Sequence, residues 1–229
     1  MQTSSLAHPQ SFHPVFQTTI SARGFHGCSL HLYYALPALI FCDPYELSNR
    51  ADAYSFQHAG PSNLELPVAA LDPAAGNASL LLSITPPKSA SGELLDVEVE
   101  VPLHVRYGAV AAQTANGSSL APFQRTELPW PEAFFACPAR TSTDALPPMP
   151  PALAAPFGTS TIFVLKTPEG VTPVEVLETP VGAAADVRTV ELWTAVVVMA
   201  SFFYLVQAMR RTVVRMRASR SAPTREKNE

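Results

Sequence analysis

The stretch LLDVEVEVPLHVRYG, Leu94 to Gly108, contains an alternation of apolar and polar side chains that no helix would place on separate faces. From Leu95 to Tyr107 the odd positions are apolar or aromatic, and the even positions hold three acids, a proline, a histidine and an arginine. Successive side chains of a β-strand point to opposite faces. The pattern therefore predicts an extended segment with one apolar face that packs against a hydrophobic core and one polar face.

Pro102 interrupts this stretch. A single strand from Leu95 to Tyr107 would be more than about 40 Å long, which is unusual in any domain. Proline has no N–H to donate to a sheet, so we expect Pro102 at an edge position or at a bend between two sheets. Six residues of strand span about 20 Å, so Glu98 and His104 cannot meet along one strand.

Other short segments have the composition of strands, and turn signals such as Asp43-Pro44 and Asn116-Gly117 separate them. The 23 prolines and 10 glycines suit short strands with irregular connections. We predict a mostly β protein, an antiparallel β-sandwich followed by a single C-terminal transmembrane helix. The further candidate strands are Phe12–Ile20, Ser29–Tyr34, Ala78–Ile84, Ala133–Cys137, Thr161–Thr167 and Val174–Glu178.

Six prolines lie between Pro138 and Pro156. Consecutive prolines cannot donate to a sheet ladder and they stiffen the chain. We therefore expect residues 138–156 to form a polyproline-like loop or the edge of the domain.

The segment LWTAVVVMASFFYLVQAM, Leu192 to Met209, has 18 residues and no formal charge. A helix of this length is about 27 Å long, near the minimum that crosses the ~30 Å hydrocarbon core of a bilayer. Trp193 lies near one end, where aromatic rings favour the membrane interface. Apolar residues cover all sides, whereas a surface helix of a soluble protein has one apolar stripe. The segment is therefore predicted to span a membrane.

Basic residues follow this segment at once, beginning with Arg210 and Arg211. Lys and Arg are enriched on the cytosolic side of spanning helices, so we expect the C-terminus in the cytosol and the body in the lumen. The tail has seven basic and two acidic residues although the whole chain has a net charge of −4, so the body is acidic. An acidic body argues against nucleic-acid binding.

Two features bear on this topology in opposite directions. The sequons at Asn77 and Asn116 favour a lumenal body that carries N-glycans. The first residues have neither the positive nor the apolar region of a signal peptide, so we expect either an upstream start or insertion by the late segment. The alternative is a tail-anchored protein with a cytosolic body and unmodified sequons.

Motifs for catalysis are sparse. We find no glycine-rich phosphate loop, no nucleophile elbow and no His or Cys pair with the spacing of a zinc site. Two clusters could support acid–base chemistry: Asp43 with Glu46, and His104 with Arg106. Carboxylates in an Asp-Pro turn usually accept local hydrogen bonds, and charges on a half-buried strand usually face solvent or a partner. We therefore expect structural or partner-binding roles, with no metal and no cofactor.

Three segments and the C-terminal anchor together resemble the PIG-X family. The segments are GCSLHLYYALPALIFCDPYELSNR (Gly27 to Arg50), LLDVEVEVPLHVRYG and LPWPEAFFACP (Leu128 to Pro138). PIG-X is the small subunit of glycosylphosphatidylinositol (GPI) mannosyltransferase I in the endoplasmic reticulum. The resemblance implies a non-catalytic subunit that stabilises a multispanning mannosyltransferase, its partner, which adds the first mannose to the GPI precursor from dolichol-phosphate mannose.

The resemblance also implies partner-binding or structural roles for particular residues. Three cysteines allow three alternative single disulfides. If the body is cytosolic, we expect all three cysteines to be reduced and buried. The resemblance implies the pair Cys28–Cys137 and leaves Cys42 incidental. The other implied residues are Asp43, Pro44, Tyr45, Glu46, Leu47, Pro102, Leu103, His104, Arg106 and Tyr107.

A second class of function remains open. The chain could be a single-pass lumenal enzyme or folding factor that uses the Asp43/Glu46 or His104/Arg106 cluster.

The expected organisation of the chain has five parts. The parts are a disordered start 1–11, a lumenal β domain 12–180, a juxtamembrane linker 181–191, a membrane helix 192–209 and a basic cytosolic tail 210–229.

Overall fold

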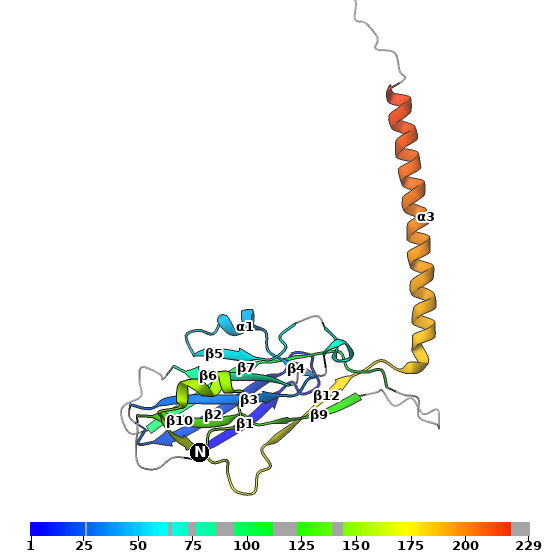
Figure 1. Cartoon of the computed structure of the whole chain (residues 1–229). Helices are drawn as coiled ribbons and strands as arrows, with labels where there is room; N and C mark the ends of the chain where they lie inside the picture. The colour runs from blue at the N-terminus through cyan, green and yellow to red at the C-terminus, as the bar shows by residue number, and fades with distance from the viewer. Residues whose placement is uncertain are drawn as a thin grey trace, which may run out of the picture. The chain divides into compact units, whose positions relative to one another are not determined.

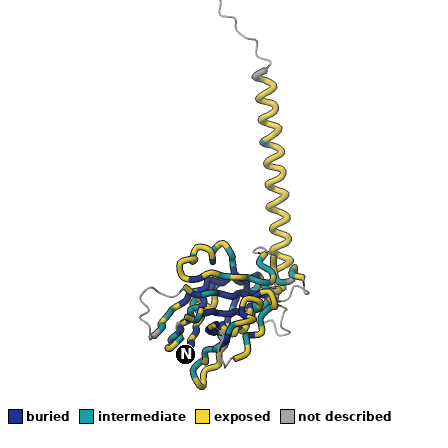
Figure 2. Tube along the Cα trace, turned by 60° about the vertical axis from the view of Figure 1, so that its left-hand side comes forward, coloured by how far each residue is buried: buried dark blue, intermediate teal, exposed yellow. Residues whose placement is uncertain are grey.

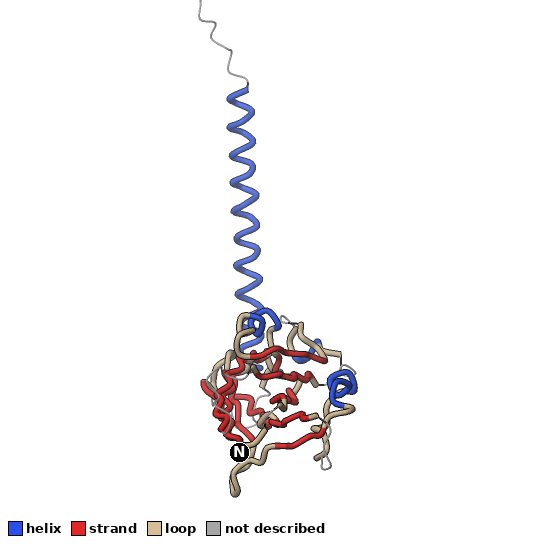
Figure 3. Tube along the Cα trace, turned by 90° about the vertical axis from the view of Figure 1, so that its left-hand side faces the viewer, coloured by secondary structure: helices blue, strands red, loops and turns tan. Residues whose placement is uncertain are grey.

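The computed structural model describes residues 1–25, 27–63, 66–72, 77–85, 94–111, 123–138 and 144–220. The described residues divide into a β domain, which extends to Val181, and a second unit, which begins at Gly182. Strands dominate the β domain, and one long helix dominates the second unit (Figure 3). The prediction of antiparallel β structure followed by one apolar C-terminal helix is confirmed.

The first sheet is exposed on one face and buried on the other. Its inward side chains include Phe16, Ile20, Val99 and Val101, all at most 3% exposed, whereas Glu98 on the opposite face is exposed. The alternation seen in the sequence is therefore that of a sheet with one polar face. The sheet has the order β1-β2-β7, with β1 at Gln2–Ala7, β2 at Val15–Arg23 and β7 at Leu94–Pro102 (Figure 1).

The second sheet is buried on both faces at its centre, so its strands are nearly continuous runs of apolar residues. In β3 the side chains of Leu32, Tyr33 and Tyr34 are all buried, although neighbours in a strand point to opposite faces. The sheet has the order β11-β10-β3-β6-β5. Its strands are β3 (Ser29–Leu36), β5 (Tyr54–Ala59), β6 (Ala78–Ile84), β10 (Glu132–Cys137) and β11 (Thr161–Val164).

The main hydrophobic core lies between these two sheets. The rings of Phe16 in β2 and Tyr34 in β3 meet edge to face, with centroids 5.9 Å apart. Leu32 and Leu80 from the second sheet belong to the same buried cluster as Val101 from the first. Figure 2 shows this interior in dark blue. Each fully buried leucine or valine contributes about 1.5–3 kcal/mol, so this cluster is the principal stabilising contact of the domain.

The other face of the second sheet is covered by a helical segment from the proline-rich region. Leu153 and Phe157 pack there against Phe134 and Leu81. Of the two alternatives expected for 138–156, a polyproline-like loop or the edge of the domain, the loop is therefore wrong for the last part, because prolines are well tolerated in the first turn of a helix. The segment consists of α2 (Pro151–Ala154) and the 3-10 turn η3 (Ala155–Phe157).

Two short ribbons complete the β domain. One is β9 with β12, whose side chains Leu128 and Leu177 join the main core. The other is β4 with β8, which forms part of the candidate site. The remaining elements are β4 (Ile40–Phe41), α1 (Pro44–Ser48), η1 (Val68–Ala70), β8 (His104–Val105), β9 (Phe123–Pro129) and β12 (Val174–Pro180).

The start of the chain is ordered, so the expectation of disorder over residues 1–11 is wrong. The side chain of Gln2 is buried, and its Oε1 accepts a hydrogen bond of 3.0 Å from the N–H of Ala133. Ser4 Oγ lies 3.0 Å from Thr18 Oγ1 across β1 and β2. Polar residues thus build β1 through paired hydrogen bonds, which an apolar pattern could not reveal.

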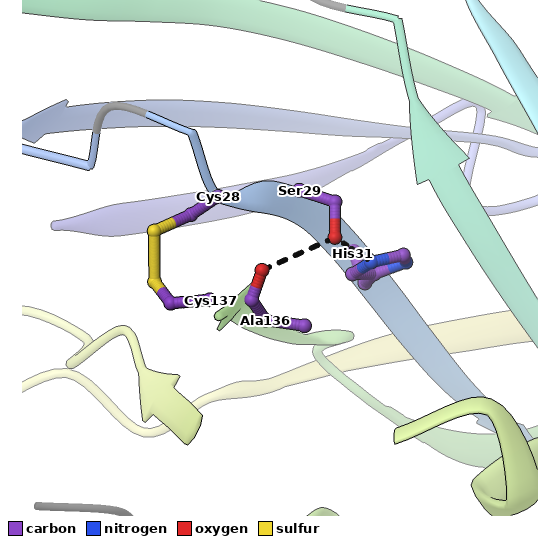
Figure 4. The surroundings of a disulfide bond; sticks show 5 residues. All are labelled: Cys28, Ser29, His31, Ala136 and Cys137. Carbon is purple, nitrogen blue, oxygen red and sulfur yellow. Dashed lines mark hydrogen bonds between the residues drawn. A yellow bond between two sulfur atoms is a disulfide. The ribbon is translucent and has the colours of Figure 1, made fainter. Parts of the chain in front are cut away.

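Cys28 and Cys137 form a disulfide, the pair that the resemblance implies. The bond joins the start of β3 to the end of β10 (Figure 4). Beside it, Ser29 Oγ donates to the carbonyl of Ala136 and lies 2.7 Å from His31 Nε2. Cys42 is buried as a thiol, and burial raises its pKa to about 12, so it stays protonated and unreactive.

The second unit contains α3, a helix from Val187 to Arg220 preceded by the 3-10 turn η4 (Ala184–Asp186). Among the described residues this is the one helix long and apolar enough to cross a membrane, with a mean hydropathy of 1.8 in its most apolar window. The expected linker 181–191 and tail 210–229 are both partly helical, because α3 extends beyond 192–209 at each end.

Removal of the disulfide should lower the free energy of unfolding by about 2–5 kcal/mol, because a cross-link over 109 residues restricts the unfolded chain. Thermal unfolding of the detergent-solubilised protein, with and without reductant, measures this effect. Reductant should lower the Tm of the wild type and leave that of a Cys28→Ser/Cys137→Ser variant unchanged. An equal response of both proteins would contradict the expectation.

Candidate functional site

The Asp-Pro-Tyr-Glu-Leu motif forms the short helix α1 and the residue before it. Asp43 is the N-cap: its Oδ1 accepts a hydrogen bond of 2.9 Å from the N–H of Tyr45. Pro44 occupies the first turn, where its missing N–H costs nothing. Leu47 points into the main core and is fully buried, while Tyr45 is 80% exposed. The motif thus anchors one side of the helix and presents Tyr45 on the other.

The Pro-Leu-His-x-Arg-Tyr motif begins where β7 leaves the first sheet. β7 ends at Pro102, as the proline predicts, and the N–H of the buried Leu103 donates to the carbonyl of Pro14 at 2.9 Å. The next two residues form β8, which pairs with β4 rather than continuing in the first sheet. Since β4 lies just before α1, this pairing brings the two motifs together.

The motifs meet in a contact between Glu46 and His104. His104 Nε2 lies 2.7 Å from Glu46 Oε2, and both side chains are partly exposed. Phe41 stacks on the imidazole of His104 with ring centroids 5.3 Å apart, and His13 contacts the same ring edge-on. The side chain of His104 is therefore held between an aromatic neighbour and a carboxylate.

Arg106 is buried beneath this contact. Its guanidinium carbon lies 4.3 Å from the ring centroid of Phe41, a cation–π geometry. The guanidinium also donates to the carbonyls of Pro61, Asn63 and Leu66, so it holds one stretch of loop against the domain. Burial lowers the pKa of this guanidinium from its ordinary value. With a residual exposure of 3%, Arg106 has a structural role.

The alternation predicted for this motif is wrong at its end. The pattern placed Tyr107 on the apolar face and Arg106 on the polar face, but Tyr107 is 74% exposed and Arg106 is buried. The reason is that the strand ends at Val105, after which side chains no longer alternate as in a sheet. The ring of Tyr107 rests against Phe12, with centroids 5.3 Å apart.

The acids of β7 take no part in this arrangement. Glu100 makes an ion pair of 3.2 Å with Arg50 and accepts a hydrogen bond from Gln17. Asp96 accepts a hydrogen bond from Ser21 on the neighbouring strand. The row of acids is therefore the polar face of a sheet. In the described part of the chain, no group of three or more His, Cys, Asp or Glu side chains could hold a metal ion.

The two sequons differ in what can be said of them. Asn77 is exposed just before β6, while the hydroxyl of Ser79 is buried and lies 3.2 Å from the hydroxyl of Tyr33. A glycan on Asn77 would project from the surface of the folded domain. Asn116 lies outside the described residues.

The contacts identify site residues that the sequence patterns did not reveal. Phe41 is the residue on which both His104 and Arg106 pack, and it was not among the candidates. Phe12 and His13 reach the site from a segment expected only to begin a strand. Four of the motif residues with exposed or partly exposed side chains, Tyr45, Glu46, His104 and Tyr107, are called the motif surface.

Comparison with known proteins gives a consistent assignment. The family model described as PIG-X / PBN1 matches residues 9–210. Protein pbn1 of Emericella nidulans is 26% identical over 151 residues, which are 59% of this chain and 27% of that protein. Protein pbn1 of Neurospora crassa is 32% identical over 120 residues, 51% of this chain and 22% of that protein. The chain thus aligns with about a quarter of the length of these curated relatives.

In the described part of the chain, an antiparallel β domain followed by one candidate membrane helix is consistent with a single-pass membrane protein. Since the family model matches most of its length, the chain belongs to the PIG-X/PBN1 family. Membership of this family indicates a role in GPI-anchor biosynthesis in general.

Replacement of Arg106 by alanine should lower the free energy of unfolding by about 2–4 kcal/mol, because the carbonyls of Pro61, Asn63 and Leu66 lose the buried guanidinium that donates to them. Arg106→Lys should not restore stability, since an ammonium lacks the planar fork that reaches several carbonyls. Arg125→Ala is the matched control: its ion pair with Glu178 is exposed and contributes about 1 kcal/mol or less. Urea unfolding of the three variants measures the differences; equal losses for Arg106→Ala and Arg125→Ala would contradict the structural role.

Proposed function

We propose that this chain is a non-catalytic subunit that binds and stabilises the catalytic GPI mannosyltransferase I subunit in the endoplasmic reticulum membrane. That partner is a multispanning protein that adds the first mannose to the GPI precursor. In this proposal α3 anchors the chain, the β domain lies in the lumen, and the motif surface contacts the partner.

The observation that carries the proposal is that the two motifs contain residues of two kinds: some fold the site, and others present exposed side chains. Asp43 caps α1, Leu47 fills the core, and Arg106 holds a loop, so these residues fold the site. The folded motifs present two large exposed rings, those of Tyr45 and Tyr107. Tyrosine is enriched at protein interfaces, where its rigid ring contributes contact area at a low entropic cost. A motif that presents such rings is typical of a binding surface.

The same contacts argue against a catalytic role for two of the four residues that the alternative function would use. The Asp43 carboxylate is engaged as a helix cap and the Arg106 guanidinium is buried under loop carbonyls, so neither is placed to reach a substrate. Glu46 with His104 is the one observation that favours a lumenal enzyme or folding factor, because a carboxylate 2.7 Å from an imidazole is an acid–base geometry. Glu46→Gln separates the two functions: an enzyme loses activity while its own level and the partner level stay normal, whereas in a stabilising subunit any loss of function is accompanied by a fall in the partner level.

Truncation of both exposed rings should weaken the partner complex without unfolding the domain. In a Tyr45→Ala/Tyr107→Ala variant, we expect the mannosyltransferase subunit and GPI-anchored surface proteins to fall several-fold, because interface aromatics often contribute about 1–2 kcal/mol or more each. Immunoblotting and flow cytometry of cells that express only the variant provide the measurements.

Phe123→Ala is the control for this experiment, since Phe123 is an aromatic residue of β9 that is 50% exposed and lies outside the motifs. It should leave both levels unchanged. Normal partner levels in the double tyrosine variant, at normal abundance of the variant itself, would exclude the motif surface as the contact.

The lumenal placement of the β domain has its own test. Removal of N-glycans should increase the gel mobility of the wild type expressed in cells, and Asn77→Gln should remove part or all of this shift. Asn77→Gln/Asn116→Gln should abolish it. A wild type that shows no shift, together with a β domain that added protease digests in intact microsomes, would support the cytosolic, tail-anchored alternative.

A further inference from the structure

The hydrogen-bonding side chains of the membrane segment lie on one side of α3. The helix is continuous through residues 192–209. At 100° per residue, Thr194 and Ser201 lie within about 20° of each other, and Tyr204 and Gln207 follow at successive steps of about 60°. All four occupy an arc of about 140°, which also contains Trp193 and Val197. We call these four residues, with the two small residues Ala200 and Ala208 between them, the polar seam of α3.

The opposite side of the helix has a different composition. It carries bulky apolar side chains such as Val198, Met199, Phe202, Leu205 and Val206. Apart from Ala195, no small or polar residue of the membrane segment interrupts it. This side is suited to contact with lipid, which leaves the polar seam as the side that requires another partner.

The four polar side chains of the seam have no hydrogen-bonding partner in the described part of the chain. By contrast Thr212, one turn beyond the segment, donates to the carbonyl of Ala208 at 3.0 Å. Tyr204 is 71% exposed. A hydroxyl or amide in hydrocarbon costs free energy unless it is hydrogen-bonded, and transmembrane helices satisfy such groups by pairing with one another. Alanines at the contact allow the helix backbones to approach closely.

We propose that the polar seam packs against transmembrane helices of a multispanning partner that presents hydrogen-bonding side chains at the same depth. This rests on the proposed function, which supplies the identity of the partner. The width of the seam favours this occupant over a second copy of the chain. A two-helix contact uses a narrow seam, whereas a stripe broader than about 100° is typical of a helix that packs into a bundle.

The test is recovery of the catalytic mannosyltransferase subunit with the tagged full-length chain, from cells solubilised in mild detergent. Ser201→Phe places a bulky apolar ring in the seam that lipid accepts and a close helix contact does not. Ala195→Phe makes a similar small-to-large change on the lipid-facing side and is the matched control. We expect Ser201→Phe to lower recovery about tenfold and Ala195→Phe to change it less than about twofold.

The outcomes separate this inference from the proposed function. If the wild type recovers the subunit and Ser201→Phe recovers as much, at equal abundance in the membrane fraction, the seam is not the contact and the proposed function stands. If the wild type recovers none, the proposed function fails and the inference fails with it. If two differently tagged copies co-purify, and Ser201→Phe abolishes only that recovery, the occupant is a second copy and the inference is overturned.

Discussion

The candidate site depends on two residue pairs, Ile40 with Val105 and Phe41 with His104, which join β4 to β8. These pairs connect segments far apart in the sequence, and they form because β7 leaves the first sheet at Pro102. A continuous strand would have kept His104 on the polar face of that sheet, beside the acids. The bend instead carries the histidine to Glu46 and the guanidinium of Arg106 to the ring of Phe41. One proline thus determines which charged groups meet.

The sequence reveals those parts of the fold whose side-chain pattern reports burial directly. Alternation identifies β7, and continuous apolar runs identify β3 and β6, because one sheet is buried on one face and the other on both. β1 is polar, and its burial depends on hydrogen bonds of Gln2 and Ser4 to distant residues, which no local pattern encodes. The same limit applies to the candidate site. Each motif can be recognised in the sequence, but the contact between the two motifs depends on pairing of strands that are distant in the sequence. Phe41, on which the contact rests, differs in no way from the apolar residues around it.

Burial and exposure within the motifs are physically linked. A guanidinium that is almost wholly buried is stable only when several donors are satisfied, so Arg106 fixes the positions of the carbonyls around it. The capped helix α1 is fixed in the same way by Asp43 and Leu47. Rigid supports reduce the ordering that exposed rings undergo on binding, and this raises affinity without any added contact. Under the proposed function, the buried residues of the motifs therefore affect partner binding through Tyr45 and Tyr107.

A subunit without chemistry of its own can raise the abundance of a partner by mass action. Binding to the native state alone stabilises it by RT ln(1 + [L]/Kd), which is about 2.7 kcal/mol at a subunit concentration of 100 Kd. In our proposal the chain has two contacts, the motif surface and the polar seam of α3. Each contact can be modest by itself, because once one has formed the other is intramolecular and its effective concentration is high. Loss of either contact should then lower partner abundance far more than the isolated contact energy suggests. The remaining contact binds alone, without the high effective concentration that the first contact provides.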